Sequence, residues 1–536
     1  MTPNRPVVRL ATTMVASIGL ASAVAAQPPS RRGSVPPAQF ADPDRITKLS
    51  SSFADIDRVF QTYAEREHIA GAVWGIVIDG KLAHVGVTGY RDVASKSPVD
   101  SGTVFRIASM TKSFTALAIL KLRDEGKLSL DDPAERWVPE LAGLAYPTSD
   151  SPRLTIRHLM SHATGFPEDN PWGDQQLAVT DDAMSAMMRA GIPFSNAPGV
   201  AYEYSNYGFA ILGRIVTKAS GMPYRRYISE NILRPLGMTS TTLEPRDVAP
   251  GRLAQGYRWE DEKWKLEPQL PDGAFGSMGG MLTSMRDLGL YVGMFLGAWP
   301  PRDGEETGPV KRSSLREMQQ IQRPRPPAVV RSATGGLQLY SGGYAYGLGV
   351  SSDCNFAHIV AHSGGLPGFG SIMRWLPEYG VGIIAFGNRT YTGWGGPATE
   401  AFGLMLKTGG LVPRAAQPSA FLVQRRDEVS RLVMQWNDRL ADSLASVNLF
   451  LDRSRERRKA AIEKLLVDVG PCRPGTGFEF VENGLRGQWT MPCDRGTLRV
   501  SITLAPTMPP TVQFLDVSRS PNVPMVPRGV CSTSEP

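Results

Sequence analysis

The chain has 536 residues, of which 42% are hydrophobic and 20% charged, the composition of an ordinary globular protein with two or three domains. Its formal net charge is +7 at pH 7, but the basic residues are scattered and form no stripe interleaved with aromatic residues, so no nucleic-acid partner is expected. The four cysteines are too widely spaced for a zinc site.

The first 26 residues predict a secretory signal peptide. Arg5 and Arg9 supply a basic segment, and an apolar run of small residues ends in a small-x-small cleavage pattern at Ala26. This run is too short and too rich in alanine for a membrane anchor, and no later stretch is long enough for a transmembrane segment. We therefore expect an exported protein, periplasmic or secreted, in which residues 27–45 form a flexible linker rich in Pro, Ser and Arg.

A catalytic domain is expected to span residues 46–412. Apolar side chains at helical spacing predict a helix over residues 53–63. The strand-like runs 72–78 and 81–88 flank Asp79-Gly80, which is a strong signal for a β-hairpin. The domain is therefore expected to open with a helix followed by antiparallel strands.

Ser109 and Lys112 form an S-x-x-K pair at the start of an apolar helix that ends at Gly126. Three residues are about one helical turn, so the hydroxyl and the amine share a face. A serine hydroxyl needs a neighbouring base to act as a nucleophile, and a lysine in an apolar setting can be that base because burial favours the neutral amine. Alone, the pair also fits a helix N-cap followed by a surface lysine.

The middle of the chain, residues 130–340, predicts helices and irregular loops. His158 and His162 form an H-x-x-x-H pair, but Leu159 stands where a metalloprotease needs Glu. We therefore expect two structural histidines on a helix beside the active-site wall. Residues 297–336 are rich in Pro, Gly and charge and predict connecting surface loops.

Strands return from Tyr344 onward. Residues 369–376 and 381–386 predict two strands, and residues 397–407 predict a closing helix. Strands at both ends of the domain with helices between them predict one antiparallel sheet flanked by helices, an α+β fold.

Residues 418–536 predict a small second domain, also α+β, to which the sequence assigns no chemistry. Residues 421–468 are charged and helical, and two strands flank Asn483-Gly484 as a hairpin. Further strands are expected over residues 498–504 and 512–517.

The cysteines predict at least one disulfide, since export would permit such bonds. The expected register of the hairpin brings Cys472 close to Cys493, and we expect these two residues to pair. Cys354 is then either free or paired with Cys531.

Three motifs stand in order along the chain: Ser109-x-x-Lys112, Tyr204-x-Asn206 before an apolar helix, and His362-Ser363-Gly364 at the opening of a strand. Together they resemble the motifs of serine hydrolases related to class C β-lactamases and penicillin-binding proteins. The resemblance runs from about residue 53 to residue 410, and it implies that family's antiparallel sheet flanked by helices.

The resemblance implies a role for each motif residue. Ser109 would be the acylated nucleophile, and Lys112 would hold or take its proton. Tyr204 would act as general base toward Ser109 and as acid toward the leaving group; its pKa, about 10 when free, must be lowered by a cation such as Lys112. Asn206 would orient Lys112 and the substrate amide. Backbone N–H groups of Ser109 and Gly365, beside Gly364, would form the oxyanion hole.

His362 departs from the β-lactamase pattern, in which a lysine at this place attracts the substrate carboxylate. A neutral imidazole suits esterases, peptidases and amidases better, and anionic substrates should gain as the ring becomes cationic between about pH 8 and about pH 5.5. Lys407-Thr408-Gly409 also spells the β-lactamase third motif, but it follows a predicted helix and is interpreted as a helix C-cap.

The expected function is therefore that of a serine hydrolase acting through an acyl-enzyme on a small or peptide-like ester or amide. A true β-lactamase or D-Ala-D-Ala carboxypeptidase is one alternative, and a non-hydrolytic sensor that is acylated once is another. Neither a metal nor an organic cofactor is implied.

Overall fold

The computed structural model describes residues 39–331 and 336–520 of the chain. The predicted signal peptide, most of the predicted linker and Cys531 lie outside these residues. Within them no helix is long and apolar enough to cross a membrane.

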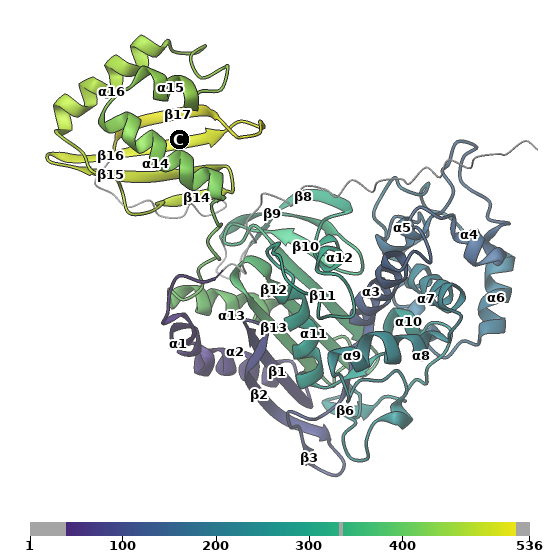
Figure 1. The fold of residues 1–536 in the computed structure, drawn as a ribbon. Helices are drawn as coiled ribbons and strands as arrows, with labels where there is room; N and C mark the ends of the chain where they lie inside the picture. The colour runs from purple at the N-terminus through teal and green to yellow at the C-terminus, as the bar shows by residue number, and fades with distance from the viewer. Residues whose placement is uncertain (1–38, 332–335, 521–536) are drawn as a thin grey trace, which may run out of the picture. The chain divides into compact units, whose positions relative to one another are not determined.

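An antiparallel sheet of nine strands forms the centre of the first part of the described chain (Figure 1). It joins strands from both ends of the predicted catalytic domain, because β1 pairs with β13. In spatial order the strands are β3 (Ser97–Pro98), β2 (Lys81–Asp92), β1 (Gly71–Ile78), β13 (Val381–Gly387), β12 (Phe369–Leu376), β11 (Ile359–Leu366), β10 (Gly349–Ser352), β9 (Leu337–Tyr344) and β8 (Arg323–Arg331).

The predicted hairpin is confirmed. Asp79 and Gly80 both have positive φ, 50° and 80°, and connect β1 directly to β2. A two-residue turn with this geometry matches the twist of the strands it joins. All residues of β1 are buried, because both faces of this central strand are covered.

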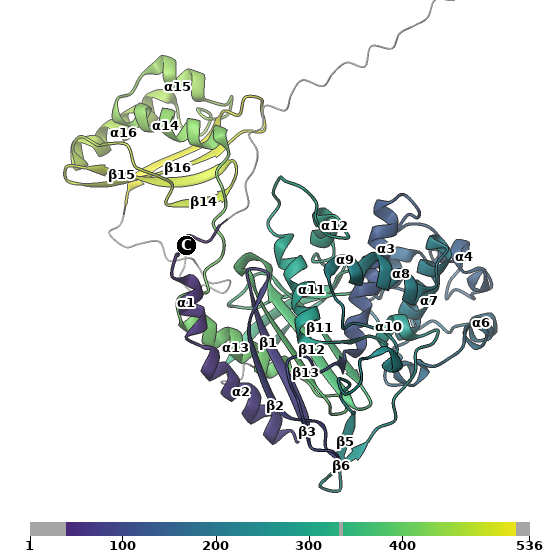
Figure 2. The same cartoon turned by 60° about the horizontal axis from the view of Figure 1, so that its bottom comes forward.

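One face of the sheet is covered by α1 (Arg45–Ser50), α2 (Phe53–Arg66) and α13 (Gly395–Lys407), as Figure 2 shows. Their apolar side chains pack with those of β1 and β13 in one hydrophobic cluster. The predicted helices over residues 53–63 and 397–407 are both confirmed.

The helical region lies between β3 and β8 in sequence and packs on the other face of the sheet. Its buried centre is α3, whose apolar and polar side chains are both enclosed. The helices are α3 (Thr111–Asp124), α4 (Ala134–Trp137), α5 (Ile156–Met160), α6 (Asp181–Ala190), α7 (Asn206–Ser220), α8 (Tyr224–Ile228), α9 (Arg234–Leu236), α10 (Gly276–Gly279), α11 (Met285–Gly297) and α12 (Arg312–Glu317). Two short antiparallel pairs accompany them, β4 (Phe105–Arg106) with β7 (Leu282–Thr283) and β5 (Tyr257–Glu260) with β6 (Lys263–Leu266).

The prediction that residues 297–336 are only connecting loops is wrong, because this stretch contains α12 and the edge strand β8. The three prolines in β8 argued against a strand, because proline lacks the N–H group that a central strand must donate. An edge strand tolerates proline because one of its sides has no partner. The strand pairs with β9 and interrupts its register between Arg325 and Ala328.

The C-terminal part has its own hydrophobic core, built from residues 422–515. Three helices, α14 (Ala420–Met434), α15 (Asp438–Leu444) and α16 (Arg455–Val469), accompany a four-stranded antiparallel sheet. Its strands are β14 (Phe480–Asn483), β15 (Arg486–Cys493), β16 (Gly496–Leu504) and β17 (Val512–Arg519). The α+β class is confirmed for both parts, whereas the exact domain limits, 46–412 and 418–536, stay predictions.

The predicted disulfide between Cys472 and Cys493 is present. Cys472 lies directly opposite Cys493, in an isolated bridge outside β14, rather than two residues away. The bond encloses the turn of the hairpin and both of its strands.

Replacing Cys472 and Cys493 together by serine should destabilise the C-terminal part by about 3 kcal/mol, because the bond closes a loop with a sequence separation of 21 residues. Chemical denaturation followed by the fluorescence of Trp489, which is fully buried in this core, measures the change. Retention of wild-type stability in the double variant would contradict this prediction.

Candidate active site

Ser109 lies on the 3-10 turn Ala108–Met110, immediately before α3. Ala108 has a φ of 49°, in the left-handed region that residues other than glycine seldom occupy. The Ser371 hydroxyl donates to the Ile107 carbonyl at 2.8 Å and fixes the turn against β12. The serine of the first motif is therefore held in a strained, anchored turn.

Gly364 of the third motif packs directly behind this turn. A Cβ atom at this position would lie 2.1 Å from the Ile107 oxygen, so no larger residue fits without a backbone shift. Gly365, one residue further along β11, lines the cleft together with Ser109, whereas Gly364 is buried and does not line it. His362 lies inside β11 rather than at its opening, because the strand begins at Ile359.

Lys112 is completely buried one turn after Ser109. Its Nζ atom lies 3.1 Å from Ser109 Oγ, 2.6 Å from Asn206 Oδ1 and 2.9 Å from the Met278 carbonyl oxygen. Burial lowers the pKa of this amine from 10.5 to about 7, although Asp174 and Asp169 favour its charged form.

These three contacts determine how the neutral amine must be oriented. The Asn206 and Met278 oxygens can only accept, so the two hydrogens of a neutral amine go to them. The remaining lone pair then faces the Ser109 hydroxyl. In the charged form, all three N–H groups donate and Ser109 accepts.

Asn206, the first residue of α7, is oriented by two contacts of its own. Its amide nitrogen donates to Asn170 Oδ1 at 2.6 Å, and its backbone N–H donates to Asp169 at 2.7 Å. Ser205 caps the helix by accepting from the Gly208 N–H group. The amide oxygen of Asn206 is thereby turned toward Lys112.

Tyr204 lies next to both motif residues. Its ring centroid is 4.8 Å from Lys112 Nζ, and its phenol hydrogen-bonds with Ser109. The prediction that Lys112 lowers the pKa of this phenol is wrong. Burial raises this pKa well above 10; the hydrogen bond with Ser109 opposes the rise, and Tyr202 and Asp174 add to it. Tyr204 is thus held as a neutral phenol.

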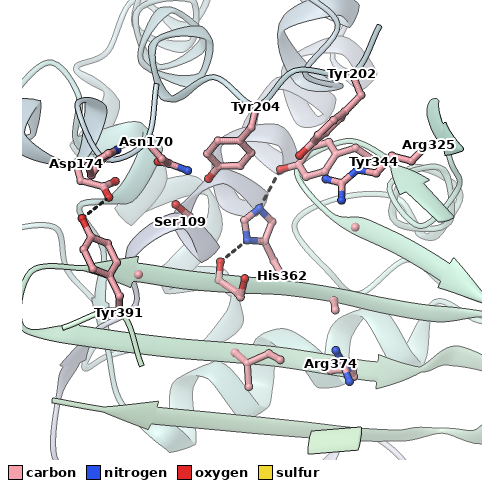
Figure 3. A pocket seen from close by; sticks show the side chains of 16 residues that line it. Ser109, Asn170, Asp174, Tyr202, Tyr204, Arg325, Tyr344, His362, Arg374 and Tyr391 are labelled. Carbon is pink, nitrogen blue, oxygen red and sulfur yellow. Dashed lines mark hydrogen bonds between the residues drawn. The ribbon is translucent and has the colours of Figure 1, made fainter. Parts of the chain in front are cut away.

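His362 is neutral for a related reason. Burial and the nearby Lys112 lower its pKa from 6.5 to about 3. Its Nδ1 atom lies 2.6 Å from the Ser363 carbonyl, to which it donates, so Nε2 accepts from the Tyr344 hydroxyl at 2.9 Å (Figure 3). The ring therefore gains no charge between pH 8 and pH 5.5. The prediction that kcat/KM for anionic substrates rises through protonation of this residue is wrong.

His162 lies beyond the end of α5, not on the helix as predicted, and has a φ of 52°. It holds the residues on both sides of Tyr204: its carbonyl accepts from the Glu203 N–H group at 2.9 Å, and its Nδ1 accepts from the Ser205 N–H group at 3.1 Å. Its ring, fully buried, also contacts the Tyr204 ring with centroids 4.3 Å apart. Burial lowers its pKa well below 6.5, so it is a neutral acceptor.

A cleft of about 680 Å³ opens above Ser109. Tyr204, His362 and Gly365 line it, as predicted for residues at the site. Further residues that line it had not been predicted: Asn170, Pro171, Asp174, Tyr202, Arg325, Tyr344 and Tyr391. They come from loops, from the 3-10 helix Gly173–Gln176, from the edge strand β8 and from its neighbour β9, where no periodic pattern signals a site.

The cleft carries opposite charges on the two sides of Ser109 (Figure 3). Asp174 lies on one side, and Arg325 lies on the other, with its guanidinium 3.9 Å from the centroid of the Tyr202 ring. Arg374 also borders the cavity, but it hydrogen-bonds Thr399 of α13 on the opposite face of the sheet. No group of metal-binding side chains occurs in the described residues.

Lys407-Thr408-Gly409 lies at the C-terminal end of α13. Lys407 is exposed, and Gly409 has a φ of 72°, as expected beyond a helix end. None of the three residues lines the cleft. The interpretation of this sequence as a helix C-cap is confirmed.

Known bacterial proteins are similar in sequence to this chain. The chain is 27% identical over 360 residues to penicillin-binding protein 4* of Bacillus subtilis. The aligned residues make up 62% of this chain and 71% of that protein. It is 30% identical over 349 residues to protein flp of Staphylococcus aureus, covering 64% of each chain, so it spans less than two thirds of that relative.

The fold is similar to that of the octameric penicillin-binding protein homologue from Pyrococcus abyssi, with a TM-score of 0.53 and 23% identity over 84% of this chain and 90% of that one. The family model described as Beta-lactamase matches residues 56–403, which is more than half of the chain. This protein therefore belongs to the Beta-lactamase family.

Proposed function

We propose that this protein is a serine hydrolase that forms an acyl-enzyme on Ser109 and acts on an ester or an amide. The observation that carries the proposal is the buried amine of Lys112, which lies 3.1 Å from Ser109 Oγ with a pKa of about 7. An amine with this pKa exists partly in its neutral form at neutral pH, and its lone pair then faces the serine proton.

Acylation follows from this arrangement. Ser109 Oγ bonds to the substrate carbonyl carbon while its proton passes to Lys112 Nζ. Tyr204, held as a phenol, gives its proton to the leaving group, and Lys112 returns a proton to Tyr204. The oxygen of the tetrahedral intermediate would be stabilised by the backbone N–H groups of Ser109 and Gly365. Water then releases the acyl group from Ser109.

Compared with the expected roles, Lys112 alone is the base toward Ser109 in this proposal, and Tyr204 keeps only the role of acid toward the leaving group. Lys112 is the base, because burial stabilises its neutral form. Tyr204 is the acid, because burial stabilises its protonated form. A pair of groups whose environments favour opposite protonation states suits acid–base catalysis.

A β-lactamase or D-Ala-D-Ala carboxypeptidase remains the alternative within the family. The neutral His362, with both ring nitrogens engaged by protein groups, offers no positive charge to a substrate carboxylate. Arg325 supplies a cation elsewhere in the cleft. Parallel assays with a chromogenic cephalosporin and with p-nitrophenyl acetate discriminate the two activities, and we expect the ester to be hydrolysed faster.

A sensor that is acylated only once is the alternative from another class. It would release one equivalent of p-nitrophenol per molecule and then stop, whereas a hydrolase continues to release product. Steady release beyond one equivalent supports the proposed function.

We also propose that the protein is exported, with residues 1–26 as its signal peptide. The disulfide between Cys472 and Cys493 supports this, since such bonds persist in oxidising compartments. Mass spectrometry of the mature protein, with Gln27 expected as its first residue, tests the cleavage site.

Replacing Ser109 by alanine should abolish both labelling by a fluorophosphonate and hydrolysis of p-nitrophenyl acetate, because the acylated oxygen is missing. Lys407→Ala is the matched control: it removes the lysine of Lys407-Thr408-Gly409, which lies outside the cleft, and should retain wild-type turnover. Labelling of the Ser109→Ala variant at the wild-type rate would contradict the proposal that Ser109 is the acylated residue.

The kcat/KM for a neutral ester should rise with pH through an apparent pKa of about 7, because only neutral Lys112 accepts the serine proton. Activity should therefore be lost as the pH falls below 7, and His362 should add no second transition above pH 5.5. A stopped-flow pH profile from 5.5 to 9 measures this. A flat profile would exclude Lys112 as the titrating base.

His162 is proposed as a positioning residue for Tyr204. His162→Ala removes the acceptor of the Ser205 N–H group and the ring beside Tyr204, and should lower kcat by roughly 10- to 100-fold with a smaller change in KM. His162→Asn should restore part of the loss, since asparagine keeps an acceptor and tolerates positive φ.

The thermal unfolding midpoints of both His162 variants serve as the control. If kcat follows the unfolding midpoint in both variants, with no separate rescue by asparagine, His162 has only a structural role.

A further inference from the structure

Cys354 is joined to another residue by a disulfide bond. It lies in the connection between β10 and β11, and no cysteine among the described residues is free. The sequence has four cysteines, of which Cys472 and Cys493 pair with each other. Within a single chain, Cys531 is therefore the only cysteine left to bond with Cys354.

The connection that carries Cys354 is a fixed point of the first part of the chain. Asp353 folds it into a tight turn, because its carboxylate accepts from the Asn355 and Phe356 N–H groups at 2.8 and 2.9 Å. The Phe356 ring is buried and contacts the Phe402 ring of α13, with centroids 6.0 Å apart. A bond at Cys354 therefore attaches its partner to the folded sheet rather than to a free loop.

The sheet next to this connection has one uncovered face. On the side of α2 and α13, the hydrophobic cluster beneath the helices contains residues of β1, β13, β12 and β11, but no described residue of β8, β9 or β10. Ile359 of this cluster pairs with Ser351 of β10, which pairs with Gly342 of β9, so Tyr340 points to the same side. The register of β8 and β9 places Val330 on this side too.

Val330 and Tyr340 leave this face open to solvent, since 39% and 37% of these residues are exposed. Ser341, next to Tyr340, pairs with Ser352 of β10, two residues before Cys354. The exposed face, defined by Val330 and Tyr340, therefore borders the disulfide-bonded connection. It also includes the edge strand β8, whose free side presents backbone groups to any segment that packs there.

Residues 521–531 have a composition that suits this face. Their prolines predict an extended segment, since proline fixes φ and lacks the N–H group that a helix needs. Extended segments that carry prolines and apolar residues dock on exposed aromatic and apolar side chains. A chain of this length spans up to about 40 Å, enough to cross β8, β9 and β10 at about 4.8 Å per strand. The prolines are Pro521, Pro524 and Pro527, and the apolar residues are Val523, Met525, Val526 and Val530.

We propose that residues 521–531 bind to the exposed face and that Cys531 forms a disulfide with Cys354. The bond forms when the two thiols pass two electrons and two protons to the disulfide of a thiol–disulfide oxidoreductase, which is released as a dithiol. The bound segment removes Val330 and Tyr340 from water and shields the edge of the sheet.

This coverage stabilises two strands that also belong to the candidate active site. Arg325 of β8 and Tyr344 of β9 line the cleft, so the segment supports one wall of the cleft from outside. The coverage does not depend on the chemistry at Ser109.

Mass spectrometry of a tryptic digest without reduction tests the bond. Trypsin cleaves after Arg331, Arg374 and Arg528, so the digest should contain peptide 529–536 linked to peptide 332–374. The starting material is monomeric protein that was produced by export into the periplasm and alkylated before digestion. Alkylated Cys531 in this material, or a covalent dimer as the only species that carries the link, would overturn the proposal.

Hydroxyl-radical footprinting tests the coverage. Tyr340 and Tyr90 are similarly exposed, at 37% and 41%, and lie near opposite edges of the sheet, so Tyr90 is the matched control. In the full chain, Tyr340 should be oxidised several-fold more slowly than Tyr90. A chain that ends at Ser520 keeps every described helix and strand and should oxidise the two tyrosines at similar rates. Equal rates in the full chain would contradict the coverage.

Limited proteolysis follows the segment instead of the face. Replacing Val330 and Tyr340 together by serine removes the apolar side chains of the face and should raise the rate of trypsin cleavage after Arg528 several-fold in the oxidised protein. Both side chains are partly exposed, so their loss leaves the core intact. Tyr90→Ser should cleave at the wild-type rate. An unchanged rate in the double variant would overturn the docking of residues 521–531 on this face.

Discussion

The site depends on one physical constraint, the enclosure of the Lys112 amine inside the protein. A charged amine away from water loses its hydration, and only well-placed acceptors compensate for this loss. The fold provides three acceptors from three different segments, the turn of Ser109, the start of α7 and the end of α10. Because this compensation is partial, the charged and neutral forms lie close in free energy at neutral pH.

Much of the surrounding structure serves this arrangement. Gly173 must be glycine, since a Cβ atom there would lie 2.6 Å from the Asn206 side chain that receives the amine. Asn170 and Asp169, from the same loop, orient Asn206 through its side chain and its backbone. Hydrogen bonds thus tie the loop that carries Asp174 to Asn206, the acceptor of Lys112.

Local motifs made the centre of the site predictable. The S-x-x-K spacing places Ser109 and Lys112 on one helical turn, and this proximity does not depend on contacts with distant parts of the chain. Hydrophobic alternation and the Asp79-Gly80 turn likewise predicted the sheet, since both depend on nearest neighbours.

What sequence reasoning missed depends on distant contacts. The pKa values of His362 and Tyr204 follow from burial by segments far apart in the chain. Arg325 lies on a proline-rich strand that forms only as a sheet edge. Residues 421–468 were expected to be helical, and the structure divides them into separate helices, the first ending at Met434 and the next capped by Asn437.

The replacement of lysine by histidine in the third motif can now be understood through charge. Lys112 already lowers the pKa of His362, so a second ammonium group there would face the same repulsion and would depress the pKa of Lys112 in turn. A neutral histidine avoids this repulsion and instead accepts from Tyr344, which lines the cleft. Asp174 and Arg325 line the cleft instead, one on each side of Ser109.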